Sequence, residues 1–392
     1  ARAGLRIAYV SCNGQEHGYT ERDLAERNDM WQRLAEEHDR APFCLLLQGG
    51  DQVYADEALN AHPAMRRWQE LPLDERHTVP FTEEVEQAAA HFFFERYLQL
   101  YRAPKVAALL ARVPSVMMWD DHDIMDGWGS HPEPVLDSPV GQGVFRVARR
   151  MFALFQLGCV HDALPDCCAA TDAPHFGMDV RYPRLHIVVP DLRSQRRPQR
   201  VMDEDAWRYL EQALGAGEEA GRAIVMSSVP ALGPRLSLLE RLIGFAPRIR
   251  KYSDDLRDQW QSYAHREEWR RLLRALIAAS GNGNPPPVVV SGEIHLATRG
   301  TMALPGQRPL HQLVASGITH PPPPGAFARG LGWLAALGED PLPQHPIRMH
   351  ALPGQTRTYT AERNYLVLER NGAAWQASWE LEERGRTPVL NL

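Results

Sequence analysis

The apolar positions of the chain form two kinds of segment. Runs rich in apolar residues, typical of buried strands, occur at 5–12, 43–48, 113–119, 176–182, 185–190, 223–227, 288–290, 296–304, 310–316, 364–370 and 374–381. Segments with the spacing of amphipathic helices lie at 29–39, 82–101, 139–157, 205–214 and 266–279. The strand–helix–strand order at the start of the chain predicts a right-handed crossover and a mostly parallel sheet. We expect 296–304 and 310–316 in a second sheet.

Three segments lack this regular pattern and are predicted to be insertions in one domain spanning 1–392. Residues 60–80 are polar and contain several prolines, and residues 317–355 are rich in Pro and Gly and are expected at the surface. Residues 229–262 form a long stretch without strong periodicity, which is typical of a lid or binding loop. Asp254, Asp255 and Trp260 lie in this loop.

Polar side chains of ligand type follow four of the predicted strands. They are Cys12 after the first strand, Asp51 and Tyr54 after the second, Asp121 and His122 after the third, and Glu293 and His295 after the strand at 288–290. Sites in open α/β sheets lie beyond the carboxyl ends of the strands, so these side chains are predicted to converge. Their mixture of thiol, carboxylates, phenol and imidazoles suits a two-metal site, with Asp51 as the natural bridge.

The third of these strands leads into the densest group of candidate ligands. Four acids and one histidine fall between residues 120 and 126, and Trp119 and Trp128 flank them. Carboxylates this close repel one another and resist desolvation unless a cation or hydrogen-bond donors compensate. A metal site explains the pattern, and an acidic turn with hydrogen-bonded caps is the structural alternative.

Composition and charge limit the classes of function. The 392 residues are 44% hydrophobic and 23% charged, as in ordinary globular enzymes, and the formal net charge of −6 argues against a stable nucleic-acid complex. No apolar run approaches the roughly 18 residues of a membrane span. The sequence begins in a strand without a signal peptide, so we expect a cytoplasmic protein unless a leader or N-terminal domain has been trimmed. Five cysteines without regular spacing indicate reduced thiols.

Several of these segments together resemble one family. The segments are Ser11–Gly14, Gly50–Asp56, Trp119–Gly129, Asp191–Arg193 and Ser291–His295. In order and spacing they are similar to the alkaline phosphatase D-like (PhoD-like) branch of the calcineurin-like metallophosphoesterases, over residues 5 to about 316. The resemblance implies an α/β fold, a four-layer α-β-β-α sandwich of two mixed sheets with loop insertions, and a dinuclear metal site at the apex.

The resemblance also implies roles for single residues. Cys12, Asp51, Tyr54, Asp121, Glu293 and His295 would be metal ligands, with Cys12 as a thiolate that favours iron and Asp51 as the bridge. His122 would be the general acid for the leaving group, and Arg193 a phosphate-binding catalytic residue. Asp120 and Asp123 would support these ligands from behind.

This sequence departs from the family pattern at two positions. Glu293 stands where the branch usually has Asp, and the isolated ligand histidine of the superfamily has no equivalent after the strand at 223–227, where Ser228 follows instead. Few nitrogen ligands remain, so two divalent or trivalent ions, iron with calcium, are expected rather than zinc or manganese.

Each assignment has a structural alternative. Cys12 alone reads as a small buried residue, Tyr54 as a hydrogen-bonded wall, and Glu293 as a buried partner of an arginine. Arg193 could instead pair with Asp191. The remaining histidines, including His161, His175, His186 and His320, carry no spacing signal and are read as structural or exposed. A Cys12–His nucleophile pair is the rival chemistry, but it leaves the acids without a role.

The predicted function is a metal-dependent phosphoesterase that hydrolyses small-molecule phosphomonoesters or phosphodiesters with metal-activated hydroxide and His122 as general acid. The alternative is a degenerate relative that binds metal or a phosphorylated ligand without turnover. The sequence does not identify the substrate or the oligomeric state.

Overall fold

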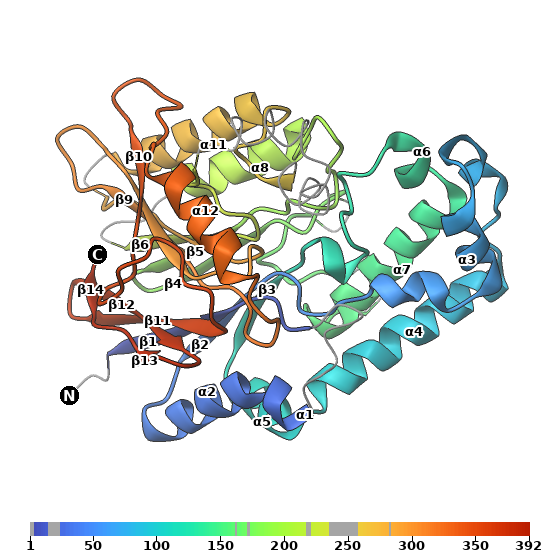
Figure 1. The fold of residues 1–392 in the computed structure, drawn as a ribbon, viewed down its shortest axis with the longest axis horizontal. Helices are drawn as coiled ribbons and strands as arrows, with labels where there is room; N and C mark the ends of the chain where they lie inside the picture. The colour runs from blue at the N-terminus through green and yellow to red at the C-terminus, as the bar shows by residue number, and fades with distance from the viewer. Residues whose placement is uncertain are drawn as a thin grey trace.

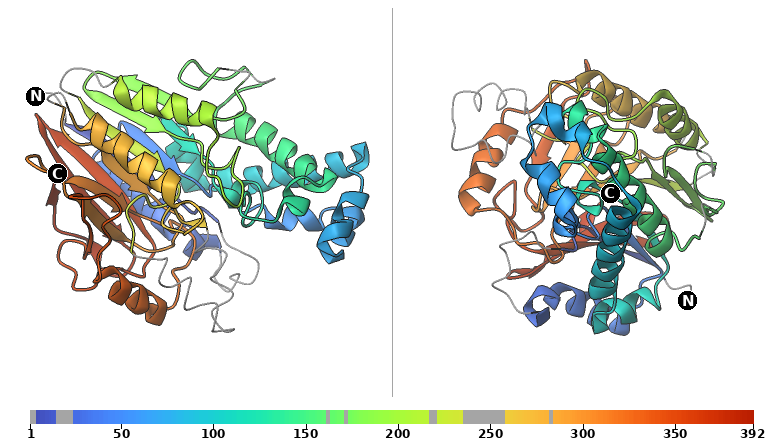
Figure 2. Two further views of the ribbon diagram at one scale, coloured as in Figure 1. Left: turned by 90° about the horizontal axis from the view of Figure 1, so that it is seen from above. Right: turned by 90° about the vertical axis from the view of Figure 1, so that its right-hand side faces the viewer.

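The computed structural model describes residues 4–14, 24–160, 163–170, 173–216, 221–234, 258–281 and 284–392. Two sheets, each of seven strands, lie face to face at the centre of the molecule (Figure 1). Helices cover the outer face of each sheet, and a separate group of helices extends to one side (Figures 1 and 2). The predicted α/β sandwich of two mixed sheets is confirmed.

The first sheet joins the beginning of the chain to its end. Its order is β13-β12-β11-β1-β2-β3, with β14 paired to β12. The strands are β1 (Leu5–Val10), β2 (Leu45–Gly49), β3 (Ser115–Met118), β11 (Asn364–Asn371), β12 (Ala374–Leu381), β13 (Gly385–Arg386) and β14 (Leu390–Asn391). β1, β2 and β3 are parallel, and β11 runs antiparallel to β1. The carboxyl ends of β1, β2 and β3 therefore meet at one edge.

The second sheet has the order β10-β8-β9-β7-β6-β5-β4. Its strands are β4 (Met178–Tyr182), β5 (Leu185–Val189), β6 (Arg222–Ser227), β7 (Val288–Ser291), β8 (Thr298–Met302), β9 (Leu310–Val314) and β10 (Ile347–His350). β5, β6, β7 and β9 are parallel, β4 and β8 run antiparallel to them, and the edge strand β10 is antiparallel to β8. The strands expected at 296–304 and 310–316 are β8 and β9.

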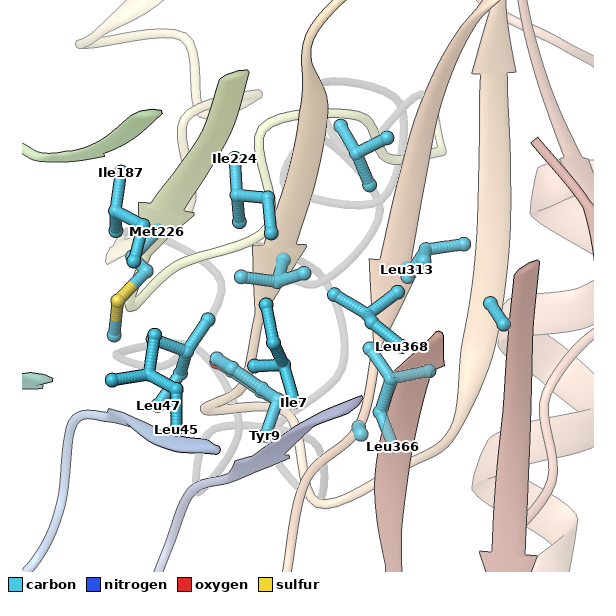
Figure 3. Close-up of a cluster of buried hydrophobic side chains, with 14 of the residues drawn as sticks. Ile7, Tyr9, Leu45, Leu47, Ile187, Ile224, Met226, Leu313, Leu366 and Leu368 are labelled. Atoms are coloured by element: carbon cyan, nitrogen blue, oxygen red, sulfur yellow. The ribbon is translucent and has the colours of Figure 1, made fainter. Parts of the chain in front are cut away.

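The alternation of side chains along each strand makes the layers. Ile7 and Tyr9 point into the space between the sheets, where they meet Ile224 and Leu313 of the second sheet (Figure 3). The residues between them point outward, because successive side chains of a strand face opposite sides. Ala8 thus packs on a helical layer instead. Apolar residues on both faces explain why these strands read as continuous hydrophobic runs.

Two helices cover the outer face of each sheet. On the first sheet they are α2 (Asp29–Arg40) and α5 (Pro104–Leu110), preceded by the short α1 (Leu24–Arg27), and on the second they are α8 (Glu204–Gly215) and α11 (Arg266–Ala279). Trp31 of α2 and Trp269 of α11 are fully buried against the sheets. The four layers of the predicted sandwich are therefore present.

A helical lobe, formed by parts of the segments that follow β2 and β3, projects beside the sandwich in Figure 1 and in the left view of Figure 2. It contains η1 (Asp56–Asn60), α3 (Pro63–Glu70), η2 (Leu73–Thr78), α4 (Glu83–Tyr101), η3 (Asp121–Asp123), α6 (Glu133–Leu136) and α7 (Pro139–Phe155). The segment 60–80, predicted as a polar insertion, belongs to this lobe and buries Met65 and Trp68 in its core. No helix among the described residues is long and apolar enough to cross a membrane.

The expectation of a surface location for 317–355 is wrong in part. The segment forms α12 (Gly325–Ala335) and β10, and His320 at its start is buried. The Pro-rich sequence hides this location because a proline run is equally compatible with an exposed linker and with a cavity wall. Of the predicted loop 229–262, residues 235–257 lie outside the described residues, and with them Asp254 and Asp255, whereas Trp260 is buried on α8.

Candidate metal centre

The predicted side chains meet beyond the carboxyl ends of β1, β2 and β3 of the first sheet and of β7 of the second. The backbone amide of Cys12 donates to the Gly50 carbonyl at 3.1 Å, and that of Asn13 donates to the Asp51 carbonyl at 2.7 Å. These bonds continue the β1–β2 pairing one step beyond the strands. The amide of Ile318 donates to the Ser11 carbonyl at 3.0 Å and brings the segment after β9 to the same place.

Four of the predicted ligands share an unusual backbone conformation. Cys12, Asp51, Glu293 and His295 have φ angles of 55°, 54°, 66° and 51°. Among the described residues only Arg184 and Gln344 also combine a side chain with positive φ. The left-handed region costs non-glycine residues roughly 1–3 kcal/mol each, and such residues cluster at functional sites. The strand ends are therefore shaped to direct these side chains, at a cost in stability.

Glycines next to these residues allow the close approach. A Cβ atom on Gly292 would lie 2.1 Å from Ser11 Oγ, and one on Gly14 would lie 2.0 Å from the ring of Tyr54. Gly50 has a φ of 98°, and a Cβ there would meet Asp120 Cβ at 2.8 Å. Gly50 and Gly292 each precede a predicted ligand and Gly14 lies two residues after Cys12, which explains why the motifs contain glycine at these points.

Two groups of side chains have the geometry to hold a metal ion. One is Cys12, Asp51 and His295, and the other is Asp51, Asp121 and His122; within each group the ligand atoms lie within 4.8 Å of one another. Cys12 Sγ lies 3.5 Å from Asp51 Oδ2. Asp51 belongs to both groups, and its role as a bridge between two ions stays a prediction.

The chemistry of this donor set fits cations. Asp51 Oδ1 is buried and has no hydrogen-bond partner in the described structure. Burial, followed by the neighbouring Asp120 and Asp121 carboxylates, raises the pKa of Asp51 well above its ordinary value. A cation would remove this penalty by neutralising the charges and using the unpaired oxygen.

His295 lies in a stack of aromatic rings. Tyr54 Oη and His295 Nε2 are 3.0 Å apart, so the phenol is close enough to share in the site. The ring of His320 stacks on His295 with centroids 3.5 Å apart, and on Tyr54 at 5.3 Å. The reading of His320 as an ordinary structural or exposed histidine is therefore incomplete: it forms a wall of the site. The prolines that follow it in the sequence, Pro321–Pro324, do not indicate that His320 lies at the site.

His122 is held by a carboxylate whose role the sequence did not reveal. Its Nδ1 lies 3.1 and 3.0 Å from the two oxygens of Asp56, and its ring stacks on Tyr54 with centroids 4.3 Å apart. Burial lowers the pKa of His122, but the carboxylates of Asp56 and Asp121 outweigh burial and raise it well above the ordinary value. Asp56 is the last residue of the Gly50–Asp56 motif, and its place in that motif is the feature of the sequence that could have indicated a role at the site.

Glu293 lines the site without joining either group of ligands. Its Oε2 accepts a hydrogen bond of 2.6 Å from Gln259 Nε2. Asp121, by contrast, is a member of one group, and its Oδ2 accepts from the Gly127 amide at 2.7 Å. The glycine turn after the acidic motif thus orients Asp121.

The acids Asp120 and Asp123 lie behind the ligands. Asp123 accepts hydrogen bonds from the amides of Asp120, Gln52 and Val53 at 2.8, 3.1 and 3.1 Å. Burial raises the pKa of Asp123 to about 7. In the position of the missing superfamily histidine, Ser228 Oγ donates to Asp120 Oδ1 at 2.7 Å. The hydrogen bonds of Asp120 and Asp123 thus hold the backbone of the acidic motif in place.

Arg193 lies in a buried network of ion pairs next to the site. Its side chain is 0% exposed and pairs with Asp120 and Asp258, while Nη1 donates to the Trp128 carbonyl at 3.2 Å. Asp191, the predicted structural partner, instead accepts from the Arg193 amide at 2.9 Å and from Trp119 Nε1 at 3.0 Å. Arg193 Nη2 also lies 3.4 Å from Asp121 Oδ1, so the guanidinium braces Asp120 and Asp121, and it is not among the residues that line the cavity. Arg196 is also buried and pairs with Asp258.

The ligand groups open into a cavity of about 260 Å³. Five acids among the described residues line it, and no Lys or Arg does: Asp51, Asp121, Asp126, Asp258 and Glu293. A phosphate group would be repelled by such a lining unless cations were bound. The remainder of the cavity is largely apolar, with Pro321–Pro324 and α12 on one side.

Fold and site together define a metallophosphoesterase-like protein. Residues 10–252 match the sequence profile of the family described as PhoD related phosphatase. The chain belongs to this family. The resemblance found in the sequence motifs is thus confirmed.

The individual proteins that this chain resembles share little sequence identity with it. An uncharacterized protein of Saccharomyces cerevisiae, YGR266W, is 24% identical over 354 residues, which are 75% of this chain and 50% of the yeast protein. The chain spans about half the length of this curated relative. A solved structure described as PhoD covers 99% of this chain and 68% of its own, with a TM-score of 0.59 and 15% identity. A dimetal phosphatase from Danio rerio is a looser likeness, with a TM-score of 0.46, 10% identity, and coverage of 99% and 98%.

Proposed function

We propose that this protein is a metal-dependent phosphoesterase that hydrolyses small-molecule phosphomonoesters or phosphodiesters. The observation that carries the proposal is the cluster of Cys12, Asp121 and His295 around Asp51, whose buried Oδ1 has no hydrogen-bond partner in the described structure, with His122 beside it. Membership of the PhoD related phosphatases and the cavity lined by acids support it. Iron with calcium is the ion pair that we propose, with zinc and manganese as weaker alternatives.

Each candidate residue has a proposed task. Cys12, Asp51, Asp121 and His295 would hold the ions, with Tyr54 next to His295 as a further oxygen donor. Bound ions supply positive charge for the phosphoryl oxygens and lower the pKa of a water. Glu293 would complete the set if its carboxylate turned away from Gln259, its partner at 2.6 Å.

His122 is the proposed general acid. Asp56 holds Nδ1 and stabilises the protonated ring, which leaves Nε2 to give its proton to the departing oxygen. The ring is kept in place by its stacking on Tyr54. Arg193 would act indirectly, by holding Asp120 and Asp258 behind the site.

The decisive experiment is removal and return of metal. Exhaustive chelation should abolish hydrolysis of 4-nitrophenyl phosphate and bis(4-nitrophenyl) phosphate, and a panel of iron, calcium, zinc and manganese should restore it. The Asp74→Asn variant is a matched control, because it makes the same substitution as Asp51→Asn at an exposed position. Full activity after chelation would contradict the proposal.

A second candidate is a relative that binds metal or a phosphorylated ligand without turnover. Ser228 in place of a ligand histidine and the Glu293–Gln259 hydrogen bond favour it. It predicts bound metal but no hydrolysis of any phosphoester in the same panel.

A further inference from the structure

The cavity has two chemically different ends. The ligand groups and the five acids form one end. The other end is lined by Pro322–Pro324, Phe327, Leu331, Met349 and Tyr359. No charged side chain among the described lining residues belongs to this second end. A substrate that filled the whole cavity would need a charged part and an apolar part.

The apolar end belongs to a small core of its own. Leu331 and Ala328 of α12 pack with Leu296 and Tyr359, and Phe327 and Met349 lie partly buried at the edge of this group. Leu296 follows His295 directly in the chain. The apolar wall and the metal-binding strand end are therefore parts of one local structure, with a fixed relation between them.

We propose that this end is a subsite for a compact apolar group carried by the phosphoester substrate, such as an aryl or short branched alkyl group. The proposal rests on the proposed function and narrows its substrate class. A cavity of about 150 Å³ lined by apolar side chains is known to hold benzene. The 260 Å³ here accommodates one ring and a phosphoryl group together, whereas a long chain would have to extend outside.

The energetic argument is the removal of apolar surface from water. A ring that leaves water for this wall gains roughly 25 cal/mol per Å² of buried area. The phosphoryl group buries no apolar surface against this wall. The gain in binding free energy therefore depends on the organic substituent alone. Selectivity for aryl over methyl esters of about tenfold or more is expected in kcat/KM.

A diester series tests the subsite with the leaving group held constant. Methyl 4-nitrophenyl phosphate and phenyl 4-nitrophenyl phosphate should differ by at least about tenfold in kcat/KM, in favour of the phenyl ester. The Phe327→Ala and Leu331→Ala variants should reduce this ratio toward one. Trp333→Ala is the matched control, because Trp333 is on α12 but 80% exposed on its outer side, and it should keep the ratio.

Binding to the metal-loaded protein separates this proposal from the proposed function. Phenylphosphonate should bind about tenfold more tightly than methylphosphonate by calorimetry, and Phe327→Ala should remove the difference. Equal binding of the two, or an unchanged ratio in both wall variants, would overturn the subsite. A preserved preference in binding without any hydrolysis would support the subsite and overturn the phosphoesterase.

Discussion

Cys12 and Asp51 leave adjacent parallel strands in the same left-handed conformation, with φ angles of 55° and 54°, and their side chains meet at 3.5 Å between Sγ and Oδ2. Two strained residues side by side cost stability unless something compensates. Asp51 adds a buried carboxyl next to Asp120 and Asp121. The arrangement is typical of a site whose stability is completed by a ligand.

Asp51→Asn should therefore abolish metal binding without lowering the thermal stability of the metal-free protein. We expect the variant to lose bound metal, because Asp51 is shared by both ligand groups. Without metal it should unfold at the same or a higher temperature than the parent, because the substitution removes a buried like charge. Elemental analysis and thermal unfolding of the metal-free proteins measure the two effects. Asp74→Asn should change neither. Full metal content in Asp51→Asn would refute the bridging role.

The pair of Asp56 and His122 predicts a pH effect with a definite sign. The Asp56 carboxylate raises the pKa of His122, and a general acid must be protonated to act. Asp56→Asn should therefore move the basic limb of the kcat profile to lower pH, since the histidine loses its proton earlier. An unchanged limb would show that His122 does not act as the acid.

His122→Asn should have a leaving-group dependence. An alkoxide needs a proton as it departs, so kcat for an alkyl ester should fall by about 10²–10⁴. A 4-nitrophenyl ester has a stable leaving group and should lose much less. His91→Asn on the exposed face of α4 is the control and should leave both rates unchanged. Equal losses for both esters would assign His122 to metal binding alone.

Arg193 should contribute to stability rather than to substrate affinity. Arg193→Gln leaves Asp120 buried without its cation and Asp258 with Arg196 as its remaining cation, and we expect a loss of about 3–5 kcal/mol in the free energy of unfolding. Adding Asp258→Asn should recover part of the loss. The control Arg197→Gln breaks a partly exposed pair with Asp137 and should cost about 0–1 kcal/mol. Urea unfolding measures all three. A stable Arg193→Gln protein with a raised KM would show instead that Arg193 binds phosphate.

Much of the fold could be predicted from the sequence because its strands are buried on both faces. Continuous apolar runs are visible without any knowledge of partners, and the helix predicted at 266–279 matches α11 residue for residue. The convergence of the candidate ligands could be predicted because a parallel sheet brings all its carboxyl ends to one edge. Both inferences use only local pattern and general topology.

The remainder depends on contacts between distant segments. Whether Arg193 faces the cavity is decided by Asp258, which lies 65 residues further along the chain. Glu293 accepts a hydrogen bond from Gln259, and His320 stacks on His295. The spacing of residues in the sequence does not predict either contact. The Pro-rich segment after His320 reads like a surface linker, yet it forms a wall of the cavity.

Glu37 links residues near the two ends of the chain, and its charge predicts that this link stabilises the fold in a pH-dependent way. On α2, its carboxylate accepts from Arg6 Nη2 at 2.6 Å, from Tyr365 Oη at 2.8 Å, and from Arg386. Burial raises the pKa of Glu37, but these partners outweigh burial and lower it. The stabilisation is thus present above the unfolded pKa and lost as pH falls. Glu37→Gln should cost about 1–3 kcal/mol at pH 6.5 and less at pH 3.5, measured by urea unfolding. Exposed Glu36→Gln is the control, and a cost independent of pH would contradict the charged network.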